Sequence, residues 1–187
     1  MKLTFLGTGT SFGVPVIGCD CPTCTSTDPR DRRTRHGAVI REGESAVLID
    51  TPPELRLQLV EAGVSTVDGV WITHCHADHI YGMDDLRAIS ARHRRRLDVF
   101  TGAECRHTLE RKFDYIFSGY TPPPGTTKPQ LRLRTIEPLD DVEIGPLRFR
   151  ALAVEHGPMT VLGFRVGDLG YVTDAKTLGP GTREALD

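Results

Sequence analysis

Three histidines and one aspartate follow directly on an apolar run at residues 69–73 of this sequence: His74, His76, Asp78 and His79. The apolar run has the composition of a strand. In an extended backbone, residues two positions apart point to the same side, so His74 and His76 can converge on one ion. The last two members of the motif follow as the chain turns and can reach a second ion. Because imidazole and carboxylate groups suit zinc, manganese or iron, the motif predicts a two-ion hydrolytic centre at the end of a strand.

The rest of the chain predicts a strand-rich α/β (α+β) fold in one domain, residues 1–187. Short runs enriched in Val, Ile, Phe and Thr predict strands at residues 2–6, 46–49, 69–73, 97–100, 131–136, 147–154, 161–166 and 171–173. Apolar residues at helical spacing predict helices at 53–62, 84–95 and 102–113. Residues 118–129, rich in Pro and Gly, predict a loop, and a further helix is expected to start near residues 179–181. A length of 187 residues with 39% hydrophobic and 26% charged residues excludes a collagenous, coiled-coil or disordered chain.

The net charge and the hydropathy of the sequence limit the kinds of molecule that the protein can bind. The formal net charge of -2 argues against a general nucleic-acid binder, which is usually basic, but it is compatible with a phosphate substrate held by metal ions. No apolar run approaches the length needed to cross a bilayer, and the first residues lack the apolar segment of a signal peptide. We therefore expect a cytoplasmic protein with a small-molecule substrate and no membrane partner.

Three of the five cysteines crowd into one short loop, residues 19–24, as Cys19, Cys21 and Cys24. In a reducing compartment such a cluster favours a metal site over a disulfide framework. Three thiolates fit three corners of a tetrahedral structural zinc site, and the alternative is three free thiols. No fourth ligand is evident. Cys75 lies inside the histidine motif, and Cys105 lies on the apolar face of a predicted helix, where we expect it to pack as a small hydrophobic residue.

At the histidine motif the chain resembles the metallo-β-lactamase superfamily, whose HxHxDH signature matches residues 74–79. The resemblance implies an αββα sandwich with two divalent ions, zinc or manganese, at the edge between its sheets. It also implies further ligands downstream. By resemblance, His156, which follows the predicted strand at 147–154, joins His74 and His76 on the first ion.

The same resemblance assigns the second ion to Asp78 and His79, with Asp174 as a bridge between the two ions. Asp174 follows the predicted strand at 171–173. Taken alone, an aspartate in that place is usually a turn former, and the upstream signature is what favours ligation. The resemblance further implies that Asp78 and Asp174 are the catalytic residues and that a metal-bound hydroxide attacks the substrate.

The N-terminal part narrows the resemblance to one branch. The run FLGTGTS at residues 5–11, the run GVP at 13–15 and the cysteine triplet are similar to the branch that contains phosphoribosyl 1,2-cyclic phosphate phosphodiesterase. In that branch the triplet carries a structural zinc ion, completed by a histidine near the C-terminus. The branch implies hydrolysis of a small cyclic phosphate or a related phosphodiester.

For several residues outside the metal motifs, the sequence allows two interpretations of their role. Asp50, at the end of a predicted strand, either accepts a hydrogen bond from a ligating imidazole and fixes its tautomer, or caps the strand. The loop at residues 7–11 either presents backbone N–H groups to a phosphate or is a tight turn that needs glycine for positive φ. The basic run at 92–96 is favoured as a solvated helix end over a nucleic-acid contact. We expect the remaining histidines, His36, His93 and His107, to be structural or surface residues.

This sequence differs from the branch at the C-terminus, because the chains of the branch continue past the position of Asp187. They add a histidine ligand for the second ion, the histidine that closes the structural zinc site, and the last strands and helix of the sandwich. Three explanations compete. The sequence is a fragment of a longer protein, the missing part comes from a second copy in a homodimer, or the chain is a degenerate copy. Intact earlier motifs favour the fragment.

Taken together, the sequence predicts a metal-dependent phosphodiesterase. One alternative is a tRNA 3′-processing endonuclease of the same superfamily, which begins with a similar FLGTG run. Such enzymes normally lack the cysteine triplet and carry an RNA-binding arm that this sequence does not show. The other alternative is a truncated, non-catalytic metal-binding remnant.

Overall fold

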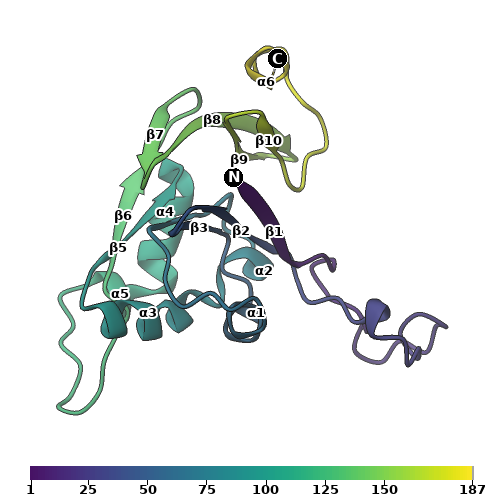
Figure 1. The fold of residues 1–187 in the computed structure, drawn as a ribbon, viewed down its shortest axis with the longest axis horizontal. Helices are drawn as coiled ribbons and strands as arrows, with labels where there is room; N and C mark the ends of the chain where they lie inside the picture. The colour runs from purple at the N-terminus through teal and green to yellow at the C-terminus, as the bar shows by residue number, and fades with distance from the viewer. Residues whose placement is uncertain (187) are drawn as a thin grey trace.

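A computed structural model describes residues 1–186 and contains two β-sheets packed face to face (Figure 1). The strands of the first sheet lie in chain order: β1 (Lys2–Gly7), β2 (Gly37–Glu42), β3 (Ser45–Ile49), β4 (Gly69–Trp71), β5 (Leu97–Thr101) and β6 (Leu131–Thr135). β1 to β3 pair antiparallel, and β3 to β6 pair parallel. The second sheet is antiparallel with the order β10-β9-β8-β7: β7 (Asp141–Ile144), β8 (Leu147–His156), β9 (Met159–Val166) and β10 (Leu169–Tyr171).

Helices lie on the outer sides of both sheets. The first sheet is covered by α1 (Leu55–Glu61), α2 (Ala77–Ile80), α3 (Leu86–His93), α4 (Ala103–Lys112) and α5 (Asp114–Phe117), with short 3-10 turns η1 (Pro29–Asp31) and η2 (Met83–Asp85) elsewhere. α6 (Pro180–Leu186) packs on the second sheet, where the Thr182 hydroxyl donates to the Ala153 carbonyl. The side chain of Leu186 fills the space where a Cβ at Gly170 would stand. The layers are therefore α, β, β and α, as the resemblance to the superfamily implies.

Alternating side chains of the first sheet fill two separate cores. In β2, Val39 faces the helices, whereas Ile40 faces the second sheet. Trp71 is fully buried between the sheets, where it stacks on Phe149 with ring centroids 5.7 Å apart. Its indole N–H donates to the carbonyl of Leu162 in β9 at 2.9 Å. Full burial of a large apolar side chain contributes about 1.5–3 kcal/mol, and here it fixes the second sheet beside the end of β4.

The predicted strands and helices are present with shifted ends, and two strands were missed. The helix predicted at 84–95 starts as a 3-10 turn and ends at His93, because Arg94 has a left-handed backbone with φ of 48°. The strand predicted at 171–173 lies instead at Leu169–Tyr171. β2 was missed although it is a central strand, and β7 was missed because it is short and half charged.

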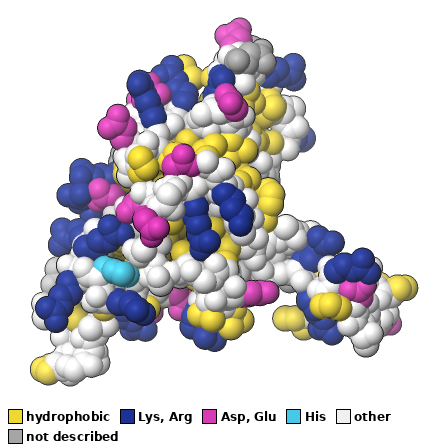
Figure 2. All heavy atoms as spheres, in the orientation of Figure 1, with side chains coloured by type: hydrophobic (Ala, Val, Ile, Leu, Met, Phe, Trp, Pro, Cys, Tyr) yellow, Lys and Arg dark blue, Asp and Glu magenta, His cyan; other side chains and the backbone are white. Residues whose placement is uncertain are grey.

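Residues 8–35, between β1 and β2, form an extension that we call the cysteine arm. It leaves the edge of the first sheet and projects away from the two sheets (Figure 1). Its two limbs meet in isolated bridges, at Gly9 with Arg35 and at Val14 with Arg33. Lys and Arg side chains and apolar groups gather on its surface (Figure 2), and the Ile17 side chain is 99% exposed. In residues 1–186, no helix has the length and apolar character needed to span a membrane.

The glycines at the base of this arm are needed for close contact between backbones. A Cβ at Gly7 would lie 2.0 Å from the carbonyl oxygen of Arg35, and a Cβ at Gly9 would lie 2.5 Å from that of Arg33. Neither glycine has a positive φ. The turn predicted at residues 7–11 is therefore explained by contact with the returning limb and not by left-handed backbone.

Candidate metal centre

The histidine motif begins where β4 ends and is tied to both sheets. The backbone amide of Leu162, in β9, donates to the carbonyl of Thr73 at 2.9 Å. His74 and His76 lie in extended backbone, and the one-turn helix α2 begins at Ala77. Asp78 and His79 are therefore on a helix, so their side chains leave the backbone in other directions than those of the two preceding histidines.

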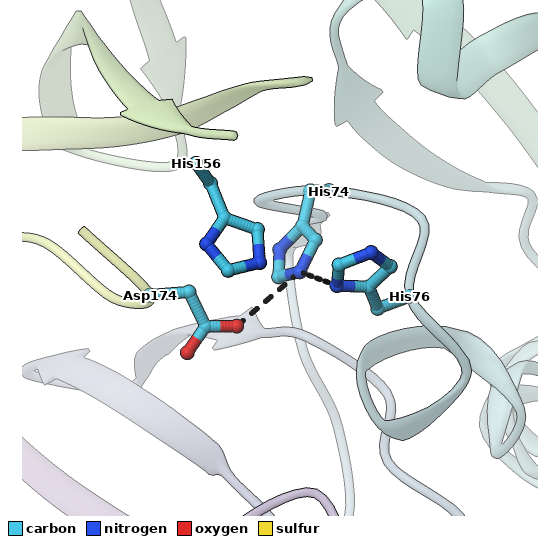
Figure 3. A group of neighbouring side chains, drawn as sticks. All are labelled: His74, His76, His156 and Asp174. Carbon is cyan, nitrogen blue, oxygen red and sulfur yellow. Dashed lines mark hydrogen bonds and ion pairs between the residues drawn. The ribbon is translucent and has the colours of Figure 1, made fainter. Parts of the chain in front are cut away.

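Four side chains converge at this end of the sandwich: His74, His76, His156 and Asp174 (Figure 3). One ligand atom from each lies within 4.8 Å of the others. Nε2 of His74 is 3.0 Å from Nδ1 of His76 and 3.3 Å from Oδ2 of Asp174. His156 ends β8, and Asp174 follows β10 with a positive φ of 52°. The two sheets therefore supply three imidazoles and one carboxylate to a common point, a donor set that suits a divalent cation such as zinc.

His79 lies beside this group and is almost fully buried. Its Nε2 is 3.1 Å from Oδ2 of Asp174 and 3.5 Å from Oδ2 of Asp78. Neither contact has the geometry of a hydrogen bond, and Nε2 has no hydrogen-bond partner within residues 1–186. A buried ring nitrogen without a partner that faces two carboxylates is costly unless a cation occupies the space. The residues present therefore fit a second cation between His79, Asp78 and Asp174.

Asp50 holds two of these histidines in position. It is fully buried at a positive φ of 60°, and its Oδ2 accepts from Nδ1 of His79 at 2.7 Å. It also accepts the hydroxyl proton of Thr73 at 2.9 Å. Because that hydroxyl donates to Asp50, it accepts from Nδ1 of His74, 3.1 Å away. Both imidazoles are thereby left with an unprotonated Nε2 that faces the centre when they are neutral.

The charges at the centre are strongly coupled. Burial lowers the pKa of His79, but the Asp50 carboxylate and Asp174 more than offset that effect and raise the pKa to about 10. The His74 and His79 rings hold the pKa of Asp174 far below its usual range. Burial and the neighbouring His74 lower the pKa of His76. Without a cation, a proton on His79 supplies the positive charge that the carboxylates require, so a metal ion would compete with that proton.

His36 is nearer to the centre than the sequence indicated. We expected a structural or surface residue, but its Nε2 lies 2.7 Å from the Tyr171 hydroxyl and 3.6 Å from Oδ2 of Asp50. Its ring centroid is 5.3 Å from that of His79. Burial lowers the pKa of His36 and raises that of Tyr171. The signal was missed because His36 directly precedes β2, a strand that the sequence pattern did not predict.

Cys19, Cys21 and Cys24 also lie together, on the cysteine arm. Their sulfur atoms are within 4.8 Å of one another, and no other His, Cys, Asp or Glu in the described part of the chain joins them. The backbone amide of Val16 lies 3.3 Å from Sγ of Cys24. A backbone amide hydrogen bond from Cys24 lowers the pKa of Cys21, which favours its thiolate. Three clustered sulfur atoms are thus available to a metal ion that prefers thiolate ligands, and the described residues supply no fourth ligand.

The other two cysteines form a disulfide, contrary to the expectation from the sequence. Cys75 and Cys105 are bonded, with their Cα atoms 5.4 Å apart. Cys105 was expected to pack as a small hydrophobic residue on its helix. Instead, Cys75 points away from the two histidines that flank it, as alternation in an extended backbone requires, and meets the first turn of α4.

Comparison with known proteins shows which family this chain belongs to. Residues 45–187 match the family described as "Beta-lactamase superfamily domain". An octanoyltransferase of Porphyromonas gingivalis is 35% identical over 187 residues, which are 100% of this chain and 37% of the relative. A ribonuclease Z of Methanopyrus kandleri is 29% identical over 139 residues, 71% of this chain and 44% of the relative. The chain therefore spans less than half the length of these curated relatives.

Two solved structures share the fold. A diphosphatase from the PhnP family is 35% identical, with a TM-score of 0.87, and the match covers 97% of this chain and 68% of that chain. A Zn(2+)-bound PqqB from Methylobacterium extorquens is 18% identical with a TM-score of 0.69, and the match covers 89% of this chain and 62% of that chain. The second likeness concerns the fold alone. Both chains are longer than this one.

Proposed function

The chain belongs to the metallo-β-lactamase superfamily, and from that premise we propose that it is a metal-dependent phosphodiesterase that hydrolyses a small phosphodiester. The observation that carries the proposal is the convergence of three imidazoles and one carboxylate at the ends of β4, β8 and β10. A structure similar over 97% of this chain is named a diphosphatase, which supports phosphoryl chemistry. The octanoyltransferase name is not carried over, because the match covers 37% of that protein.

We assign the first ion to His74, His76 and His156, with Asp174 as the ligand that it shares with the second. The contacts of 3.0 and 3.3 Å around Nε2 of His74 support this assignment. Distances of this size join hydrogen-bonded groups, and they also separate neighbouring ligands of one cation. Zinc and manganese both accept these donors.

We assign the second ion to Asp78, His79 and the shared Asp174. Its support is the buried Nε2 of His79, which faces both carboxylates without a hydrogen bond. A third, structural zinc ion is assigned to the cysteine triplet at residues 19–24, on the support of the clustered thiols.

Divalent ions in such a centre supply Lewis-acid chemistry, which neutralises charge on phosphoryl oxygens and lowers the pKa of water. The residues of the chain would hold the ions and orient the ligands. Asp50 accepts from His79 directly and from His74 through the Thr73 hydroxyl, so both rings keep their orientation. The His74 and His79 rings lower the pKa of Asp174, which favours the ionised form that binds cations. We propose that Asp78 and Asp174 are the catalytic carboxylates.

A small substrate is favoured by the space beside the centre. A cavity of about 240 Å³ opens next to the histidine motif and is lined by His74, Glu104, Glu137 and Met159, among others. A volume of this order is below that of most drug-sized ligand sites.

The proposal is tested by metal analysis and phosphodiester turnover on the same purified chain, with bis(p-nitrophenyl) phosphate as the substrate. We expect about three metal ions per chain and measurable turnover. Asp174→Asn should lower turnover by about 10³-fold, because it weakens the one ligand shared by both ions. Asp168→Asn, the same change at an exposed turn, is the matched control and should leave turnover unaltered.

Two results would contradict the proposal. Turnover that survives in Asp174→Asn would place the chemistry elsewhere. A folded chain that binds no metal under zinc or manganese saturation would support the alternative of a non-catalytic remnant.

A tRNA 3′-processing endonuclease is the second candidate. The observation that favours it is the similarity to a ribonuclease Z over 71% of this chain. Arginines on the exposed cysteine arm add positive charge: Arg30, Arg32 and Arg33. A precursor tRNA with a 3′ trailer, offered beside a small cyclic phosphodiester, separates the candidates. Cleavage of the tRNA at much the higher kcat/KM would favour the endonuclease.

A further inference from the structure

The disulfide joins the middle of the histidine motif to a packed helix. Cys75 stands between His74 and His76, and its partner Cys105 lies in the first turn of α4. α4 is anchored by the buried Leu109 and by a hydrogen bond from Arg106 to the Thr135 hydroxyl in β6 at 3.1 Å. The bond therefore connects a loop that carries two candidate metal ligands to a fixed part of the fold.

Two features hold Cys75: its packing in the core between the first sheet and the helices, and the disulfide. In the part of the chain that the structure describes, no backbone hydrogen bond is made by the N–H or C=O of Cys75, or by those of His74. The nearest backbone restraints are at Thr73, which accepts from Leu162, and at His76, which accepts from His79. Breaking the disulfide would therefore release a short segment whose two flanking side chains must stay within about 3 Å of each other.

The bond can be reached from solvent. Both cysteines line the cavity of about 240 Å³ beside the centre. Cys75 is 9% exposed, whereas Cys105 is half-buried. A small thiol can enter through the cavity, where Cys105 is the more exposed of the two residues. Disulfides of proteins in reducing compartments are mostly transient, catalytic or redox-sensing, and the sequence predicts such a compartment for this chain.

We propose that Cys75 and Cys105 form a redox-sensitive site that controls metal binding: the disulfide holds the histidine loop ready for metal, and its reduction lowers metal affinity. The proposal rests on the metal centre of the proposed function and assigns its regulation. The co-reactant is a dithiol. One of its thiolates attacks Sγ of Cys105 and forms a mixed disulfide, and Cys75 leaves and takes up a proton. The second thiol then displaces Cys105, which also takes up a proton. Two electrons pass to the protein, and the dithiol becomes a disulfide.

The redox state itself can be read from tryptic peptides. Cleavage after Arg and Lys places Cys75 in the peptide 57–87 and Cys105 in the peptide 97–106, so the oxidised chain yields a linked pair. The full chain is treated with oxidised glutathione or with a phosphine reductant, desalted without air and mapped by mass spectrometry. We expect the linked pair in the oxidised form and its loss after reduction.

The effect on the centre is measured by zinc affinity against a chromophoric chelator. The parent is Cys19→Ser/Cys21→Ser/Cys24→Ser, so that zinc on the cysteine arm does not contribute. Reduction should lower zinc affinity by about 10-fold or more, as a lost restraint behind metal ligands does. The matched control, Cys105→Ser in the same parent, retains every assigned ligand and should give one affinity under both treatments. If the parent fails to fold, cobalt bound to the wild-type chain serves instead, because its thiolate bands separate the arm from the histidine centre.

Each outcome is decisive. Equal zinc affinity before and after reduction, or the absence of the linked peptides after oxidation, would overturn the redox site while the metal centre and its turnover stand. Zinc that binds in neither redox state would overturn the metal centre of the proposed function and the redox site together.

Discussion

The histidine centre lies at the end of two packed sheets, whereas the cysteine triplet lies on an arm that projects from them (Figure 1). In the centre, His74 and His76 follow β4, His156 ends β8 and His79 lies on α2. The rings of His74 and His79 are oriented through the buried Asp50. On the arm, Cys19 and Cys21 are exposed, and two isolated bridges join the limbs. Groups of ligands that look alike in a sequence therefore differ in what positions them. The fold positions the first group, and we predict that metal binding contributes more to the order of the second.

The largest expected effect concerns stability of the metal-free protein. Asp50→Ala leaves the protonated His79 buried without its partner, so we expect the free energy of unfolding to fall by about 3–5 kcal/mol. The same change at the exposed Asp20 of the arm should stay within about 0.5 kcal/mol. Urea unfolding of the metal-free variants measures both. Equal effects would show that the fold prepares neither region.

The next effect concerns metal affinity, and it tests whether the two regions act separately. Asp50→Asn preserves the shape of the side chain but not its charge, so zinc affinity at the histidine centre should fall by about 10–100-fold. Zinc on the arm should be unaffected. Cys21→Ser should do the reverse, with loss of the arm zinc and unchanged phosphodiester turnover.

Competition with a chelator measures the zinc affinity of both variants, and metal analysis then measures how many zinc ions each one retains. Loss of zinc from both regions after either substitution would contradict their independence.

A smaller effect concerns the order of the arm. If zinc organises the cysteine triplet, its removal should speed tryptic cleavage at Arg30, Arg32 and Arg33 by about 10-fold, which corresponds to about 1.4 kcal/mol. Cleavage within the two sheets should stay slow, because their strands are hydrogen-bonded to neighbouring strands and their apolar side chains are buried. Time-resolved mass spectrometry, with and without a chelator, measures the cleavage rate in the arm and in the sheets separately. An arm that is equally resistant without zinc would be ordered by the chain itself.

The smallest effect compares one ion pair in each region. In the first sheet, hydrogen bonds from Arg132 hold the pKa of Asp98 below its usual value. The pair therefore stabilises the fold above the ordinary pKa of about 4 and is lost as the pH falls through the lowered pKa. Asp98→Asn should cost no more than about 1 kcal/mol at pH 7, and the cost should vanish near pH 2. Asp28→Asn removes the corresponding pair with Arg30 on the arm.

We expect no measurable change in the unfolding midpoint for Asp28→Asn at either pH, because its partner is highly exposed. If both variants lost the same amount of stability with the same pH dependence, the exposure of an ion pair would not explain how much it contributes.

The layers of the fold and the residues brought together at the centre were largely predictable from the sequence, because a motif and two strand-end residues carry local signals. His156 and Asp174 were found through the family pattern, and the spacing of the chain alone gave no contact between them. His36 and the Cys75–Cys105 disulfide were not found. Both depend on which distant segments the sheets bring together, at β2 and at α4, and no local pattern records that.

The strands of the first sheet lie in the order in which they are made, so each one emerges from a ribosome beside a partner that already exists. Asp174, in contrast, is synthesised last among the assigned ligands and comes from beyond the second sheet. At about 5–20 residues per second, the thiols of the arm are exposed to the cell on the order of ten seconds before the Asp174 carboxylate. A nascent chain can therefore take up zinc on its arm well before its histidine centre can be loaded.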